Sequence, residues 1–381
     1  MDRIDETVRW MEREHLDALV LRLTENIVML SGYQPQLGAS AVVVTPQAGA
    51  VVIAADVESP EVERGWNKNV SFYSLPGPGL LASFPAIVRA IPGFKKGGRV
   101  GYEGSFEWIA PPANFAEANA VGEPTRQMIG ETFEPREIVD VTAGLTRLKA
   151  VKTEQEIARL RIANEIAGFG LQAFKEAVAP GRREIDIASD VEAAIRLKGT
   201  GYKGVLVARS VCQITSGPGT VVHWRYAASG TRVVQEGETV MLEMGTTADG
   251  FWADHTRTLV AGRPNDRQRE IFAAVAESVD AAFQASKPGV TGGEIDAAAR
   301  QSLKRHGLEY PHHTGHATGF RYHEASLAIV PGSRDIVEEG MVHVAEPGVY
   351  IEGIGGFRIE DDAVVTRQGT ERLSHLTYDL D

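Results

Sequence analysis

The stretch "TVMLEMGTTADGFWADHTRT", residues 239–258, constrains the fold more than any other part of the chain. Two apolar, β-branched runs flank an Asp-Gly pair, which is the strongest short-range signal for a β-hairpin with a two-residue turn. A turn at this pair places Gly245 opposite Asp254 and Glu243 opposite Thr256. Because strand side chains alternate between faces with a period of two, all four are expected on one face of the hairpin.

The two acids of this hairpin pose an electrostatic problem. On the predicted register, Glu243 and Asp254 lie diagonally across the ladder, about 7–8 Å apart at the backbone. Gly245 is expected to leave an open space beside them. Two like charges on a half-buried face repel each other and lose hydration, so a positive group is expected there. Alternatively, the acids face water at a wet edge, and a one-residue slip of register would separate them.

Length and composition restrict the class of protein. A chain of 381 residues is too long for one ordinary core, so two domains are expected. The net charge of −12 argues against nucleic acid or an anionic membrane as a partner. No apolar run approaches the length of a membrane span, and the charged N-terminus lacks the apolar core of a signal peptide. The single cysteine, Cys212, excludes an internal disulfide and indicates a reducing, cytoplasmic location.

The chain changes character near residues 145–152. Before this point, a helical pattern at about residues 3–14 and several β-rich runs indicate an α/β domain. After it, Thr153 followed by Glu156 forms a capping box that opens an amphipathic helix. We therefore predict an N-terminal α/β domain at residues 1–148 and a second, larger domain at 149–381.

The second domain contains a weak internal repeat. The segments at 174–202 and 283–310 share a helix end, a Pro-Gly pair, a Glu-Ile-Asp sequence and a second amphipathic helix. Two such units are too few for a solenoid and indicate a duplicated α+β half that closes around one site. We therefore expect the chemistry at the centre of this pseudo-symmetry.

Polar residues recur in three later blocks. They read "PHHTGHATGFRYHE" at 311–324, "MVHVAEPGVY" at 341–350 and "GGFRIEDDAVVT" at 355–366. With the hairpin acids, they offer four carboxylates and one or more histidines in strands expected to be buried. Such ligands suit divalent ions such as Mn, Co, Fe or Zn. Four carboxylates carry more charge than one ion needs, so two ions with bridging acids are indicated, an arrangement suited to hydrolysis.

Each block also has a structural explanation when taken alone. His313 lies in a Gly-containing stretch, where a histidine more often makes a structural hydrogen bond than binds a metal. His343 lies in an alternating run and is expected to pack or to face solvent. Only the ordered set of blocks is specific.

That ordered set resembles the creatinase, aminopeptidase P and prolidase family, the "pita-bread" metallopeptidases. The family pattern runs Asp-x-Gly, then Asp in "D-x-T-R-T", "G-H-x-x-G", "E-P-G-x-Y" and "R-x-E-D-D". The chain matches it with "EMG", "DHTRT", "GHATG", "EPGVY" and "RIEDD". The resemblance covers nearly the whole chain and implies an α+β pita-bread catalytic domain behind a smaller α/β domain. One departure is Glu243, which stands where the family has aspartate and is longer by one methylene.

The resemblance also implies roles for individual residues. It implies five metal ligands for two divalent ions, which are Glu243, Asp254, His316, Glu346 and Glu360. Manganese or cobalt is the expected metal, with zinc or iron as alternatives. Glu346 is the implied general base, and the implied residues that bind or polarise the substrate are His223, His312, His323 and Arg358.

The function that these residues imply is hydrolysis of the bond between an N-terminal residue and proline in a small peptide, by a dipeptidase or an aminopeptidase. Members of the family are often homodimers. Two alternatives keep the fold and change the function: a metal-free, creatinase-like hydrolase of C–N bonds in a small amidino or cyclic substrate, or a non-catalytic peptide-binding protein.

Overall fold

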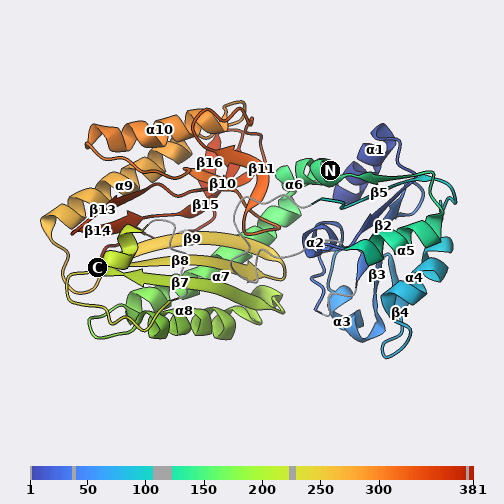
Figure 1. Ribbon diagram of the computed structural model, residues 1–381, viewed down its shortest axis with the longest axis horizontal. Coiled ribbons are helices and arrows are strands. Elements are labelled where there is room, and N and C mark those ends of the chain that lie inside the picture. Colours follow the sequence, from blue (N-terminus) through green and yellow to red (C-terminus); the bar gives the residue numbers. More distant parts are fainter. Residues whose placement is uncertain (1, 37–39, 106–121, 223–228, 375–376) are drawn as a thin grey trace. The chain divides into compact units, whose positions relative to one another are not determined.

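The structure is a computed structural model that describes residues 2–36, 40–105, 122–222, 229–374 and 377–381 (Figure 1). The described residues form two compact units, the first ending at Lys149 and the second running from Ala150 to Asp381. That the chain forms two domains with a boundary between residues 148 and 149 stays a prediction. None of the described helices is long and apolar enough to cross a membrane.

The first unit is built on a six-stranded mixed sheet with the strand order β4-β3-β2-β1-β5-β6. Strands β1, β2 and β3 are antiparallel neighbours, whereas β3–β4, β1–β5 and β5–β6 are parallel pairs. The strands are β1 (Ala18–Leu21), β2 (Ala41–Thr45), β3 (Gly49–Ala55), β4 (Val70–Tyr73), β5 (Arg99–Tyr102) and β6 (Glu137–Asp140). The helices are α1 (Arg3–Arg13), α2 (Thr24–Ser31), α3 (Ser59–Val62), α4 (Gly79–Arg89), α5 (Glu123–Phe133) and α6 (Thr142–Ala150).

The second unit consists of two halves, each with a helix pair followed by antiparallel strands. The first half comprises α7 (Glu154–Ala177), α8 (Glu184–Gly199), β7 (Ala208–Ser216), β8 (Thr239–Ala248) and β9 (Phe251–Val260). The second half begins with α9 (Asp266–Ala285) and α10 (Gly292–Arg305). Its strands are β10 (Gly315–Ala317), β11 (Glu324–Ile329), β12 (Val342–Ala345), β13 (Gly348–Ile351), β14 (Gly355–Arg358), β15 (Asp361–Thr366) and β16 (Gly369–Arg372).

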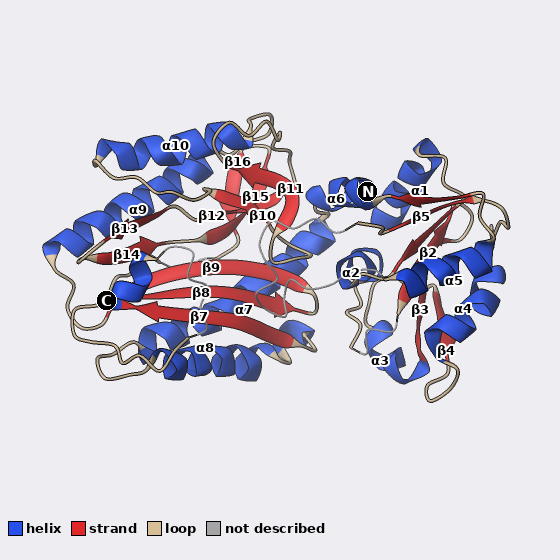
Figure 2. Ribbon diagram, viewed as in Figure 1, coloured by secondary structure: helices blue, strands red, loops and turns tan. Residues whose placement is uncertain are grey.

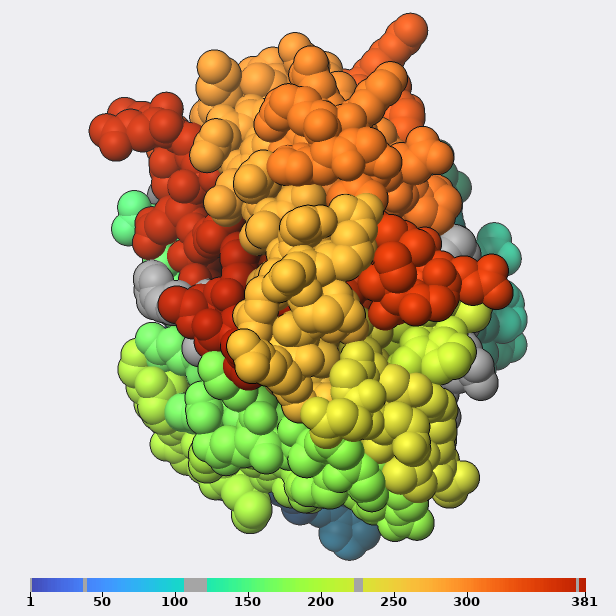
Figure 3. All heavy atoms as spheres, turned by 90° about the vertical axis from the view of Figure 1, so that its left-hand side faces the viewer, coloured from blue at the N-terminus to red at the C-terminus, as the bar shows by residue number. Residues whose placement is uncertain are grey.

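The helix pairs of the second unit cover its sheets. Helices α7 and α8 pack on the three-stranded sheet β7-β8-β9, as Figure 2 shows. Helices α9 and α10 pack on each other and against the five-stranded sheet β11-β10-β12-β15-β16 and the β13–β14 pair. Figure 3 shows the surface of this unit, with α9 and α10 in orange above the green residues of α7 and α8. The predicted duplication of helices followed by strands is therefore present.

Local sequence signals explain where the elements of this unit begin. The predicted capping box is confirmed, because the Thr153 hydroxyl accepts from the backbone N–H of Glu156 and the Glu156 carboxylate accepts from that of Thr153. Helices α9 and α10 open with capping boxes of the same kind. A backbone bridge between Thr256 of β9 and Glu360 is among the contacts that join the two halves.

Candidate metal centre

The β8–β9 hairpin has the predicted turn and register. Asp249 and Gly250 form the two-residue turn with positive φ angles of 48° and 86°. Glu243 pairs with Thr256 and Gly245 with Asp254, as predicted. The acids therefore lie on one face, and the bridge between Thr256 and Glu360 brings a third acid to the same place.

Three carboxylates meet at this face. One oxygen of each of Glu243, Asp254 and Glu360, here called the acid group, lies within 4.8 Å of the others. The hydroxyl oxygen of Thr256 is 2.6 Å from Glu243 Oε2 and 2.7 Å from Glu360 Oε2, so it joins these two acids. All three acids are buried, and none lies at the wet edge that the sequence left as an alternative.

A histidine and a fourth carboxylate adjoin the acid group. His316 Nε2 is 3.6 Å from Asp254 Oδ2 and 3.5 Å from Glu346 Oε1, and we call these three residues the histidine group. The Nδ1 atom of His316 donates to the carbonyl oxygen of Ala317 at 3.0 Å, which leaves the Nε2 lone pair facing the acids. The structure thus brings together all five residues implied as ligands, with Asp254 in both groups.

The electrostatics of the two groups differ. Burial, together with the charges of neighbouring carboxylates, raises the pKa of both Asp254 and Glu360 well above its ordinary value. Burial also acts on Glu346, but the charge of His313 and the hydrogen bond from its imidazole, with the charge of Arg358, outweigh burial and lower the pKa of that carboxyl. Burial and the nearby His323 lower the pKa of His316 to about 3, so its imidazole is neutral and available as a ligand.

Asp254 provides the test of whether a metal fits here. Its side chain is completely buried, and neither carboxylate oxygen accepts a hydrogen bond from the described residues. A buried carboxylate without hydrogen bonds is costly unless a cation binds it. The donor set of carboxylate oxygens and one imidazole nitrogen suits divalent cations. The residues therefore fit a metal centre.

The expected positive group is an arginine of β14. Arg358 Nη2 forms a short, buried ion pair with Glu243 Oε2, while its Nε donates to the Thr256 hydroxyl at 3.1 Å. The prediction of an open space beside Gly245 was wrong. A Cβ at Gly245 would lie 2.8 Å from Cε2 of Tyr322, because the tyrosine ring fills the space that the missing side chain leaves.

The remaining predicted site histidines lie in or near the histidine group. The ring of His323 packs against that of His316 with centroids 4.3 Å apart, and His323 can share a metal position with His316 and Asp254. His312 Nε2 is 2.9 Å from the hydroxyl of Tyr350, and burial lowers the pKa of His312 to about 3. The predicted substrate histidine His223 lies outside the described residues.

Sequence reasoning favoured a structural role for His313, whereas the structure places it in the site. Its Nε2 is 2.8 Å from Glu346 Oε1, and the charge of Glu346 raises the pKa of His313. The sequence signal for a role in the site was that His313 lies three residues before His316, a residue implied as a metal ligand. His343, by contrast, is buried and bonds Ser286 Oγ at 2.7 Å, in agreement with the predicted packing role.

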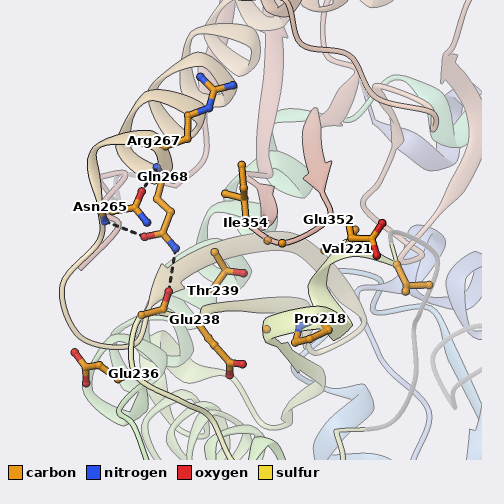
Figure 4. Close-up of a pocket in the computed structure, with 15 residues that line it drawn as sticks. Pro218, Val221, Glu236, Glu238, Thr239, Asn265, Arg267, Gln268, Glu352 and Ile354 are labelled. Carbon is orange, nitrogen blue, oxygen red and sulfur yellow. Dashed lines mark hydrogen bonds between the residues drawn. The ribbon is translucent and has the colours of Figure 1, made fainter.

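A cavity of about 790 Å³ lies at another part of the same unit, near the ends of β8 and β14 (Figure 4). Thr239 and Gly355 line it together with Glu236, Glu238 and Glu352. Among its described lining residues there is no member of the acid or histidine groups. Thr239 lies on the same face of β8 as Glu243, four residues away along the strand.

Comparison with known proteins agrees with this arrangement. The model of metallopeptidase family M24 matches residues 158–367, which include both groups. The chain belongs to this family. The Xaa-Pro dipeptidase of Pyrococcus furiosus is 29% identical over 381 residues, covering 100% of this chain and 99% of the relative. The Xaa-Pro dipeptidase of Lactobacillus helveticus is 34% identical over 243 residues, covering 63% of this chain and 64% of the relative.

Solved structures confirm the predicted fold. The prolidase from Pyrococcus furiosus superposes with a TM-score of 0.75 at 26% identity, covering 97% of this chain and 99% of that one. The prolidase from Pyrococcus horikoshii has a TM-score of 0.79 at 24% identity and covers both chains completely. The second unit therefore has the pita-bread fold, preceded by the smaller α/β unit. Family membership makes the chain a peptidase enzyme and implies divalent metal ions.

Proposed function

We propose that this enzyme is an Xaa-Pro dipeptidase, a metal-dependent hydrolase of the bond between an N-terminal residue and proline. The observation that carries the proposal is the completely buried Asp254, which belongs to both the acid group and the histidine group and whose two carboxylate oxygens accept no hydrogen bond from the described residues. The relatives named Xaa-Pro dipeptidase support the substrate class, since one of them aligns over the whole chain.

The residues that would hold two divalent cations are Glu243, Asp254, His316, Glu346 and Glu360. Manganese or cobalt is the expected metal, with zinc or iron as alternatives. Divalent cations bound at such a centre acidify water and polarise a peptide carbonyl.

Glu346 is the proposed general base. Its Oε1 accepts from His313 Nε2 at 2.8 Å, so Oε2 is the oxygen assigned to proton transfer. A water molecule attacks the carbonyl carbon before proline and gives a proton to Glu346 Oε2. When the C–N bond of the tetrahedral intermediate breaks, this proton passes to the leaving nitrogen of proline. The charge of Glu346 raises the pKa of His313 and so favours its protonated imidazole, and the hydrogen bond between the two side chains holds Glu346 in one orientation.

Four further residues are proposed to contact the substrate, and they are His223, His312, His323 and Arg358. His312 is neutral because its pKa is lowered, so it binds through hydrogen bonds rather than through charge. His323 lies beside His316, where an imidazole can steady the oxygen of a tetrahedral intermediate. Arg358 holds Glu243 and Tyr350 in place through its guanidinium group.

The experiment that tests this function has two parts. The chelator-treated protein is loaded with Mn²⁺, freed from excess ion and submitted to elemental analysis, and its hydrolysis of Xaa-Pro dipeptides is measured beside matched dipeptides without proline. Bound manganese and proline-dependent hydrolysis support the proposal. Activity on small C–N substrates without bound metal would favour the creatinase-like alternative, and no hydrolysis at all would favour a peptide-binding protein.

Substrate length and assembly are part of the same proposal. A dipeptidase should cleave Xaa-Pro but leave tripeptides of the type Xaa-Pro-Xaa intact, whereas an aminopeptidase should cleave both. We expect a cytoplasmic homodimer, which light scattering on the eluted protein and cell fractionation would test.

A further inference from the structure

The two hairpin acids have very different hydrogen-bonding environments. Glu243 Oε1 accepts from the hydroxyl of Tyr322 at 2.8 Å, and Oε2 accepts from Thr256 and from Arg358. An ionised carboxylate has about four lone-pair positions for such contacts. Glu243 therefore uses three of them on protein donors. Asp254, on the neighbouring strand, uses none of its positions on described residues.

Tyr322 is held firmly in the position from which it reaches Glu243. Its side chain is 3% exposed, and its ring occupies the space beside Gly245, where a Cβ would lie 2.8 Å from Cε2. The ring also packs near that of Trp252, with centroids 5.8 Å apart. Any larger residue at position 245 would displace this ring, so the glycine and the tyrosine form one arrangement.

The extra methylene of Glu243 completes the arrangement. Glu243 lies directly opposite Thr256 in the ladder, and its longer side chain carries the carboxylate outward to Tyr322 and Arg358. An aspartate at this position would draw the carboxylate back toward β8 and away from the tyrosine hydroxyl. The length of Glu243 and the hydroxyl of Tyr322 therefore depend on each other.

We propose that Tyr322 is a positioning residue that weakens the binding of a divalent cation at the acid group. Its hydroxyl takes one lone pair of Glu243 Oε1, so that only one of the about four lone pairs of this carboxylate is left without a donor among the described residues. This inference rests on the proposed function, because it concerns the metal centre of the hydrolase.

The test is a metal titration of the whole chain. Protein stripped with a chelator is titrated with Mn²⁺, free ion is followed by electron paramagnetic resonance, and bound ion is measured by elemental analysis. The wild type should show one tight and one weaker ion. In Tyr322→Phe the ring still fills the space beside Gly245 but the hydroxyl is gone. Because hydrogen bonds to charged groups are strong, the weaker ion should bind about tenfold more tightly while the tight ion is unchanged.

Two further variants make the result specific. Tyr310→Phe removes another buried tyrosine hydroxyl, which bonds Thr314, and should leave both affinities unchanged. In a Glu243→Asp background the carboxylate no longer reaches position 322, so Tyr322→Phe should have no further effect on the weaker ion. Thermal unfolding of each variant shows that it is folded before the titration is interpreted.

Three results would overturn the inference. The first is that the wild type binds two ions with equal affinity. The second is that the affinity for the weaker ion is unchanged or lower in Tyr322→Phe. Either result would show that the hydroxyl does not limit metal binding by Glu243, and either leaves the proposed hydrolase intact. A wild-type chain that binds no Mn²⁺ would remove the proposed function together with the inference.

Discussion

Arg358 and Glu243 form a buried ion pair between β14 and β8, with 4% and 10% of their side chains exposed. The same guanidinium group contacts the hydroxyl of Thr256 through Nε and that of Tyr350 through Nη1. It therefore fixes one carboxylate and two hydroxyls of the site with three separate nitrogens.

This geometry predicts that Arg358→Lys is not a conservative change. A lysine keeps the charge but offers a single ammonium group in place of the planar fork, so it cannot make the three contacts at once. We expect kcat/KM for an Xaa-Pro dipeptide to fall about 10–100-fold, the usual effect of losing a residue that orients ligands. The exposed Arg182, which pairs with Asp190, provides the control Arg182→Lys. Equal activity of both variants would contradict the orienting role.

The buried charge of Asp254 predicts opposite effects on stability and on metal binding. Without metal, Asp254→Asn removes a carboxylate that lies among other carboxylates and has no described hydrogen-bond donor. We expect the free energy of unfolding of the metal-free protein to rise by about 1–3 kcal/mol, as when an active-site charge is removed. The stabilisation that Mn²⁺ gives to the wild type should be lost in the variant.

Urea unfolding of both proteins, with chelator and with Mn²⁺, measures these effects. For a site at a free-ion concentration 100 times its Kd, mass action stabilises the wild type by about 2.7 kcal/mol. Asp190→Asn, a change at an exposed acid of α8, controls for the loss of a charge. A variant that is less stable than the wild type in chelator would contradict the prediction that the Asp254 carboxylate destabilises the metal-free protein.

The part of this site that sequence alone predicted is the part fixed by local rules. Turn chemistry and a period of two placed Glu243, Asp254 and Thr256 correctly, because both act within about twenty consecutive residues. The contributions of His313 and Tyr322 were not predicted, because irregular backbone between short strands carries both and no periodicity shows where their rings point. That Tyr322 fills the space beside Gly245 depends on packing between residues 77 positions apart in the chain.

The first unit shows the same limit on a larger scale. The β-rich runs that indicated an α/β domain lie in strands such as β2 and β3, whose residues are largely apolar and β-branched. Strand β6 (Glu137–Asp140) was missed, since it begins and ends with an exposed acid. It is a strand only because β5 pairs with it in parallel. Tertiary pairing of this kind overrides weak local preference.

The hairpin turn supplies a prediction about backbone conformation. Gly250 has a φ of 86°, a left-handed conformation in which a Cβ collides with the backbone. Gly250→Ala should therefore lower the free energy of unfolding by about 1 kcal/mol or more. Gly130 of α5 is the control, because a Cβ there meets nothing within 4 Å and helical backbone favours alanine. Gly130→Ala should raise stability by about 0.5–1 kcal/mol. Urea unfolding that moves both variants in the same direction would contradict the argument.

Glu103, in the first unit, predicts a pH dependence of stability. Its carboxylate accepts from the backbone N–H groups of Arg22 and Leu23 and from the side chain of Asn26, and so satisfies donors at the start of α2. Burial nevertheless raises the pKa of Glu103 from 4.5 to about 7. Between these pH values, the folded protein holds a proton that the unfolded chain has released.

The sign of the effect follows from this difference in proton binding. The free energy of unfolding should fall as the pH rises from about 4.5 to 7 and should level off above it, with a contribution of about 3 kcal/mol from this one group. Glu103→Gln cannot titrate, so the fall over this pH range should be smaller in the variant by that amount. Glu137→Gln, at an exposed glutamate of β6, should keep the wild-type profile. The measurement is urea unfolding at several pH values. If the free energy of unfolding of Glu103→Gln and of the wild type changed in parallel between about pH 4.5 and 7, the Glu103 carboxyl would already be ionised in the folded protein over this range.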